Sequence, residues 1–107
     1  MGFKHSPAPW HLRDGINEGS LLLDDNYNVV ALLSTEIKRE DENLIEAAPE
    51  LLEALRELIQ THEYSLRIGY ERIIELGDDC DSPEIMITKD SSLNKAKAAI
   101  EKALGQQ

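Results

Sequence analysis

The chain has 107 residues, a formal charge of −10 at neutral pH and an isoelectric point near 4.6. A negative charge of this size repels phosphate, which argues against direct nucleic-acid binding and against binding to an anionic membrane. No stretch approaches the roughly 18 apolar residues of a membrane-spanning helix, and the first ten residues lack the pattern of a signal peptide. Because the single Cys80 has no internal disulfide partner, we expect a protein of a reducing, cytoplasmic compartment.

The length suits a single domain, whose first part, residues 1–34, is expected to be a small antiparallel β-meander. Two short apolar runs, residues 20–23 and 28–33, flank a turn rich in Asp and Asn. With residues 10–13 ahead of them, these runs predict two or three strands.

From Thr35 the apolar spacing changes to that of a helix, which we expect to extend over residues 35–77. Pro49 interrupts the pattern and predicts either a kink or a short helix ending near Ala47, with Pro49 opening the next helix. Gly77 is a natural residue to end the helix. One apolar seam recurs every seven residues along this segment: Ile45, Leu52, Ile59, Leu66 and Ile73.

Residues 78–91 read as an acidic loop, in which residues 84–88 form a short strand or an extended lid. Ser91 or Ser92 then caps a last amphipathic helix over residues 92–105, whose lysines oppose the acidic first half of the long helix. The fold class is therefore expected to be α+β, a β-meander followed by a long helix and a C-terminal helix in an antiparallel hairpin.

The apolar surface of the long helix predicts a partner. A helix of more than 25 residues spans about 40 Å, and a last helix of about a dozen residues covers roughly half of that. We therefore expect a homodimer or higher homo-oligomer, closed through the seam of the long helix. The alternative is a monomer whose sheet folds over the remaining apolar strip.

No arrangement of residues predicts catalysis, a metal site or a cofactor. The sequence contains no glycine-rich phosphate loop, no HExxH and no paired CxxC. The acidic residues around Cys80 lack the order of a calcium loop, and they disfavour the thiolate that a cysteine nucleophile requires. We therefore expect a protein that is not an enzyme.

Cationic and aromatic residues provide the candidate ligand site. Across a dimer interface they would form an anion pocket in which a tyrosine stacks on a flat base. The alternative is that the cations form ordinary surface ion pairs with nearby glutamates. The candidate ligand-binding residues, including one acidic neighbour, are His11, Arg13, Tyr27, Lys38, Arg39, Asp41, Arg67, Tyr70 and Arg72.

Three segments of the sequence resemble a widespread group of small phage and prophage proteins: His5-Ser6-Pro7-Ala8-Pro9-Trp10, Leu44-Ile45-Glu46-Ala47-Ala48-Pro49-Glu50-Leu51-Leu52-Glu53-Ala54-Leu55, and Ala96-Lys97-Ala98-Ala99-Ile100-Glu101-Lys102-Ala103. The expected architecture also resembles that of phage anti-Thoeris sponges, which are oligomers that sequester a cyclic ADP-ribose signal without cleaving it. The chain has Glu40-Asp41-Glu42 where relatives have Ala-Asn-Ala, so a carboxylate replaces an amide suited to hydrogen-bond a ligand.

The resemblance implies a non-enzymatic counter-defence protein, a homo-oligomeric sponge for a cyclic ADP-ribose or cyclic oligonucleotide signal. A second hypothesis uses the acidic charge: the protein imitates nucleic acid and inhibits a host defence nuclease, as anti-CRISPR proteins do. The sequence supports an enzyme least.

Overall fold

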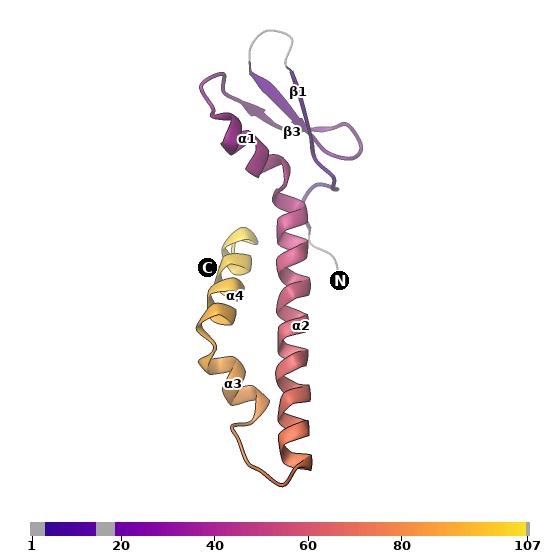
Figure 1. The fold of residues 1–107 in the computed structure, drawn as a ribbon. Coiled ribbons are helices and arrows are strands. Elements are labelled where there is room, and N and C mark those ends of the chain that lie inside the picture. The colour runs from indigo at the N-terminus through magenta and orange to yellow at the C-terminus, as the bar shows by residue number, and fades with distance from the viewer. Residues whose placement is uncertain (1–3, 15–18, 107) are drawn as a thin grey trace. The chain divides into compact units, whose positions relative to one another are not determined.

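The computed structural model describes residues 4–14 and 19–106, and it has the α+β fold that the sequence predicts (Figure 1). The chain divides into two compact units, one ending at Leu51 and the other beginning at Leu52. The first unit contains the sheet and a short helix, and the second contains most of the long helix and two further helices. Each unit is described by itself below.

The sheet is an antiparallel meander of three strands in the order β1-β2-β3. The strands are β1 (His11–Asp14), β2 (Ser20–Leu23) and β3 (Val29–Leu33). Leu22 pairs with Leu12 on one side and with Ala31 on the other, and the β2–β3 register shifts between Leu22 and Leu23. This is the meander expected from the apolar runs.

The helical region begins later than expected, at Arg39 rather than at Thr35. Ser34 holds a turn there, because its hydroxyl accepts a hydrogen bond from the Glu36 amide at 3.1 Å and its carbonyl accepts one from the Ile37 amide at 3.2 Å. Helix α1 (Arg39–Glu46) follows this turn and ends at Ala47.

The long helix α2 (Ala48–Glu75) starts directly after α1 with Pro49 in its first turn. Proline is tolerated there because an amide in the first turn has no acceptor inside the helix. Of the two predicted arrangements, the structure therefore has the short helix that ends near Ala47, followed by a new helix with Pro49 in its first turn.

The end of α2 is fixed by Gly77, whose φ of 86° lies in the left-handed region. Its amide donates to the Ile74 carbonyl at 3.0 Å, and the next amide, of Asp78, donates to the Ile73 carbonyl at 3.1 Å. This pair of bonds satisfies the last carbonyls of the helix and requires a left-handed residue between them.

The expected strand or lid over residues 84–88 is wrong, because the structure has a helix there, α3 (Pro83–Lys89). Ser82 caps it, its hydroxyl accepting from the Ile85 amide at 3.4 Å, and Pro83 occupies the first turn. Helix α4 (Ser91–Ala103) follows at once. Its cap is Asp90, not a serine, since the Asp90 Oδ1 accepts from the Leu93 amide at 2.9 Å.

The apolar core is very small in both units. Among the described residues, the buried apolar side chains are Leu22, Leu23 and Pro49 in the first unit and Leu93 in the second. In the second unit Leu58, Tyr64 and Leu76 are more than half exposed. The second unit therefore consists of helices that bury a single apolar side chain. None of the described helices is both long enough and apolar enough to cross a membrane.

Candidate binding cleft

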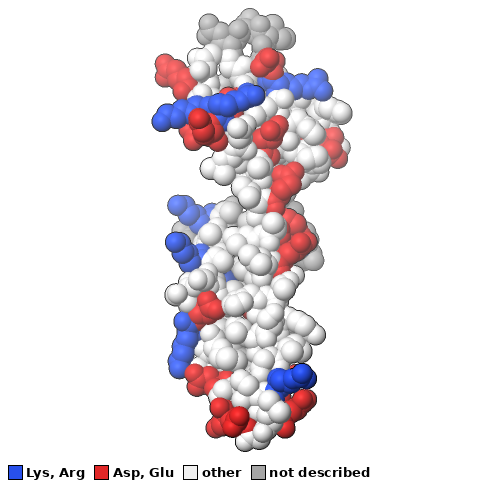
Figure 2. Space-filling view, in the orientation of Figure 1, with Lys and Arg blue, Asp and Glu red and all other residues white. Residues whose placement is uncertain are grey.

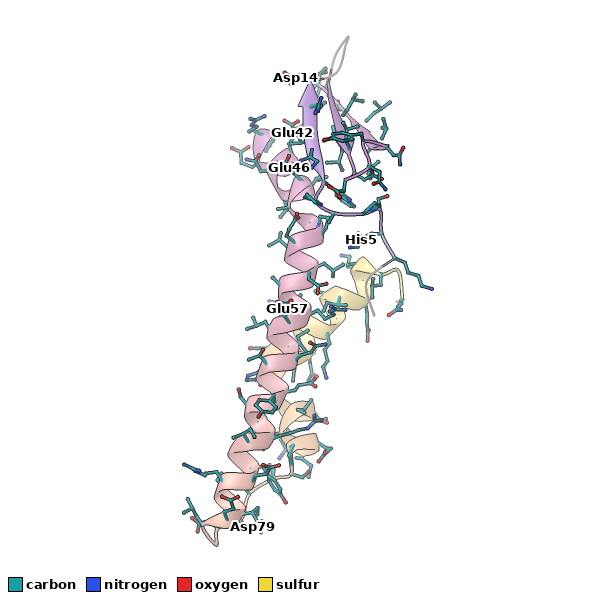
Figure 3. The ribbon with its side chains drawn as sticks, turned by 90° about the vertical axis from the view of Figure 1, so that its right-hand side faces the viewer. His5, Asp14, Glu42, Glu46, Glu57 and Asp79 are labelled. Atoms are coloured by element: carbon teal, nitrogen blue, oxygen red, sulfur yellow. The ribbon has the colours of Figure 1, made fainter. Side chains whose placement is uncertain are left out.

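A polar cleft of about 280 Å³ lies in the first unit, where α1 meets the sheet. Figure 3 labels three of the acidic residues in this region, Asp14, Glu42 and Glu46. The cleft is lined from β1, β2 and α1 by Leu12, Arg13, Asp14, Ser20, Arg39, Asn43 and Glu46.

Two glutamates, one turn apart on α1, join the helix to the sheet. The Glu42 carboxylate accepts a hydrogen bond from the Ser20 hydroxyl at 2.7 Å, and Glu46 accepts one from the Leu12 amide at 2.8 Å. Glu42 is only 8 % exposed. Because residues i and i+4 lie on the same side of a helix, this spacing lets both carboxylates reach neighbouring strands. The walls of the cleft are held by these bonds.

Arg13 and Tyr27 form a stacked pair in the same unit. The guanidinium carbon of Arg13 lies 5.7 Å from the centre of the Tyr27 ring, a cation–π distance. Asp24 shapes the turn that presents Tyr27: its buried carboxylate accepts from the amides of Asn26 and Asn28 at 2.8 and 2.9 Å. Tyr27 itself has a φ of 64° and is 68 % exposed, so one face of the pair remains available.

The charges in the cleft are mixed. Arg39 begins α1 and lies one turn before Asn43, so both side chains occupy the same side of the helix. Arg13 and Arg39 offer planar guanidinium donors that match phosphate oxygens, whereas Asp14 and Glu46 offer acceptors. The cleft therefore has the groups for a ligand that carries both anionic oxygens and N–H donors.

The structure brings together only part of the predicted ligand site. Arg13 and Arg39 line the cleft, and Tyr27 stacks on Arg13. Three other predicted residues of the first unit are exposed outside the cleft lining: His11 on β1, Lys38 at the N-cap of α1 and Asp41 in its first turn. The remaining three lie on α2 in the second unit: Arg67, Tyr70 and Arg72.

Sequence reasoning missed the polar lining residues, which are Asp14, Ser20, Asn43 and Glu46. The one available signal was the four-residue spacing of Glu42 and Glu46, which predicts a shared face but not the strand that the face contacts.

The second unit contains an apolar groove of about 240 Å³ between α2 and α4, which run antiparallel beside each other (Figure 1). The Asp90 side chain lies at one end of this contact and accepts from the His62 ring at 2.7 Å. The hydrogen bond from His62, followed by that from the Leu93 amide, lowers the pKa of the Asp90 carboxyl. The groove is lined by Leu55, Leu58, Ile59, His62, Ser92, Leu93 and Ala96.

The residues of the predicted dimer seam are half-buried within the chain: Ile45, Leu52, Ile59, Leu66 and Ile73. Ile59 lines the groove beside α4. The exposed apolar side chains of α2 are neighbours of the seam, among them Leu58 at 65 % and Ile68 at 43 % exposed. A partner for α2 therefore stays a prediction. The surface that could contact a partner is the exposed flank beside the seam, which includes Leu58 and Ile68.

Within residues 4–14 and 19–106, no three His, Cys, Asp or Glu side chains are grouped to hold a metal ion. Comparison with curated proteins and with solved structures finds no match. A family model does match, over residues 1–107, that of Salmonella phage P22 protein Y8K6. The chain is therefore a member of this phage protein family. This confirms the phage origin that the resemblance of the three segments predicted.

Proposed function

We propose that this phage protein is a non-enzymatic, homo-oligomeric binding protein that sequesters a nucleotide-derived signal of host defence. The observation that carries the proposal is the cleft of the first unit, which is lined by Arg13 and Arg39; Arg13 is also stacked on Tyr27, which lies outside the cleft lining. Cyclic ADP-ribose and cyclic oligonucleotides are the candidate ligands.

The chemistry of the cleft suits part of such a ligand. A guanidinium binds two phosphate oxygens at once, and the exposed face of the Arg13–Tyr27 pair offers a flat surface for a base. The volume of about 280 Å³ is at the lower limit for small-molecule sites, so the cleft would hold one nucleotide of a larger ligand. A second copy of the chain would supply further contacts.

Self-association is supported by how little apolar surface the chain buries. The described residues of the second unit bury one apolar side chain, Leu93, while Leu58 and Tyr64 are each 65 % exposed. Soluble monomers rarely leave large continuous apolar surface in water. A second copy of the chain would cover this surface, because a two-fold interface uses the same surface on both copies.

Titration calorimetry with isomers of cyclic ADP-ribose and with cyclic di- and trinucleotides tests the ligand. We expect micromolar or tighter binding of at least one of them, weakened about tenfold or more by Arg13→Ala and by Arg39→Ala. Lys38→Ala is the matched control, because Lys38 precedes Arg39 and carries the same charge outside the cleft lining. Absence of heat across the whole panel, at protein concentrations of about 100 µM, removes the proposal.

A second candidate is an acidic inhibitor of a host defence nuclease. It is favoured by Glu57, Glu71 and Glu75, which lie on one side of α2, are exposed and have no ion-pair partner among the described residues. Such a row of carboxylates fits a basic cleft that normally holds phosphates.

Pull-down from host lysate discriminates the inhibitor from the sponge. A basic nuclease recovered at about 50 mM salt, released at about 0.5 M salt and lost with Glu57→Gln/Glu71→Gln/Glu75→Gln supports the inhibitor. Recovery that the triple variant leaves unchanged counts against it.

A further inference from the structure

We infer that the groove between α2 and α4 is the interface with a second copy of this chain, related by a two-fold axis that runs parallel to the two helices. The inference rests on the proposed function for the existence of an oligomer and adds where and in which orientation the copies meet. Three features of the second unit carry it: an apolar groove, an exposed leucine on its rim and opposite charges on its two sides.

The groove and the leucine that can fill it belong to the same surface. Leu58 lines the groove and is 65 % exposed, whereas Leu93 on the opposite wall is buried. A two-fold interface is self-complementary, since each copy offers the surface that the other contacts. The groove of about 240 Å³ has room for a leucine side chain from the partner, and the partner's groove receives Leu58 in return.

The charges on the two sides of the groove are opposite. On α4, Lys95 is exposed and lies one turn after Ser92 and next to Ala96, two lining residues. On α2, Glu57 is exposed, directly precedes Leu58 and lies roughly 100° around the helix from it, outside the groove lining. Lys97, by contrast, is paired within the chain to Glu63 at 2.7 Å.

Lys95 and Glu57 both fall within the segments of α4 and α2 that line the groove. Lys95 lies between the lining residues Ser92 and Ala96 in sequence, and Glu57 lies between Leu55 and Ile59. Figure 2 shows this distribution at the level of α4: basic side chains on the α4 edge, acidic side chains on the α2 edge and uncharged surface between them. The order across the surface is thus positive, apolar, negative.

This order selects one orientation of the second copy. A two-fold axis parallel to the helices exchanges the two sides of the surface and leaves the position of each residue along the helix direction unchanged. Lys95 of each copy therefore faces the side of the other copy that holds Glu57. An axis across the helices would place lysine on lysine and glutamate on glutamate, and like charges placed directly opposite each other across an interface are unfavourable. The charge pattern therefore favours a second copy in parallel orientation over a foreign apolar helix, which has no reason to match both sides.

Sedimentation equilibrium of the full chain at about 0.1 M salt tests the interface. We expect a dimer at micromolar concentration. Leu58→Glu should raise the dimer dissociation constant at least about 100-fold, because it places a charge in each groove. Leu76→Glu is the matched control, since Leu76 is 75 % exposed and lies outside the groove, and it should change the constant less than about threefold.

Charge reversal tests the orientation. Lys95→Glu and Glu57→Lys should each weaken the dimer about tenfold or more, and the double variant Lys95→Glu/Glu57→Lys should return to within about threefold of the parent. Glu71→Lys, which changes the net charge as Glu57→Lys does but elsewhere on α2, is the control. Circular dichroism of each variant separates loss of the interface from loss of the fold.

The possible outcomes separate this inference from the proposed function. A protein that is monomeric at 100 µM overturns the interface, and nucleotide binding measured by calorimetry then decides the ligand independently. A dimer that Leu58→Glu leaves intact overturns the interface while the oligomer of the proposed function remains. A dimer that Leu58→Glu breaks but the double charge reversal fails to rescue overturns the parallel orientation that we infer.

Discussion

Replacing Leu93 by alanine should remove much of the stability of the second unit. Leu93 is 3 % exposed and is the one buried apolar side chain among the described residues 52–106. Leucine to alanine in a core costs about 2–5 kcal/mol, and the value rises with the cavity that remains. Leu93 borders an open groove, so its neighbours and water can fill part of the space. We therefore expect a loss of about 2–3 kcal/mol, which is a large fraction of the roughly 5–15 kcal/mol typical of a domain.

The assay is urea unfolding followed by circular dichroism at 222 nm, at one fixed protein concentration because association contributes to apparent stability. Leu76→Ala is the control, since Leu76 is 75 % exposed, and it should change the free energy of unfolding by less than about 0.5 kcal/mol. A loss below about 1 kcal/mol for Leu93→Ala would show that this side chain is not the centre of the α2–α4 packing.

Three further predictions concern single contacts. Asp90→Asn should destabilise the protein at neutral pH; because the pKa of Asp90 is lowered from its ordinary 3.8, the difference from the parent should be full above that pH and vanish as the pH falls through the lowered value, as acid unfolding curves will show. Gly77→Ala should cost about 1 kcal/mol, since its φ of 86° is strained for alanine, whereas Gly69→Ala, in open space within α2, should add about 0.5–1 kcal/mol; parallel thermal melts compare the two. Glu46→Ala should free the Leu12 amide, whose hydrogen exchange, measured by NMR, should accelerate at least about tenfold; an unchanged rate would mean that this bond does not protect the strand.

Single residues in the sequence predicted where the helices break and end. Pro49 indicated a break that the structure places at Ala47, and Gly77 indicated the end of the long helix. Both residues restrict the backbone wherever they occur, so their effect can be predicted without tertiary contacts. The apolar runs separated by Asx residues predicted two or three strands, and the structure has three.

The segment after Gly77 was misread because its apolar residues fit either period. Ile85, Met86 and Ile87 are consecutive, and so short an apolar run does not distinguish a strand from a turn of helix by its period. The decisive residues were Ser82 and Pro83, a cap followed by a first-turn proline, and both are helix-start signals.

The cleft was harder to predict because its residues come from three elements. Arg13 and Tyr27 are 14 positions apart and meet only because Asp24 bends the hairpin between β2 and β3. Glu46 reaches the Leu12 amide across 34 positions. A charge pattern in one dimension contains no information on which strand a helix faces, so a cationic cluster was predicted where the structure has a mixed one.

The bond from Leu12 to Glu46 also makes the two edges of the sheet unequal. β1 is an edge strand, and its Leu12 amide points away from β2 to the Glu46 carboxylate, which occupies a position that an added strand from another molecule would need. Such blocking protects edge strands from uncontrolled pairing. On the opposite edge, β3 exposes Val29 and Leu32, at 57 % and 78 %. If this protein forms fibrils on storage, growth should therefore begin at β3, and a lysine at position 32 should suppress it.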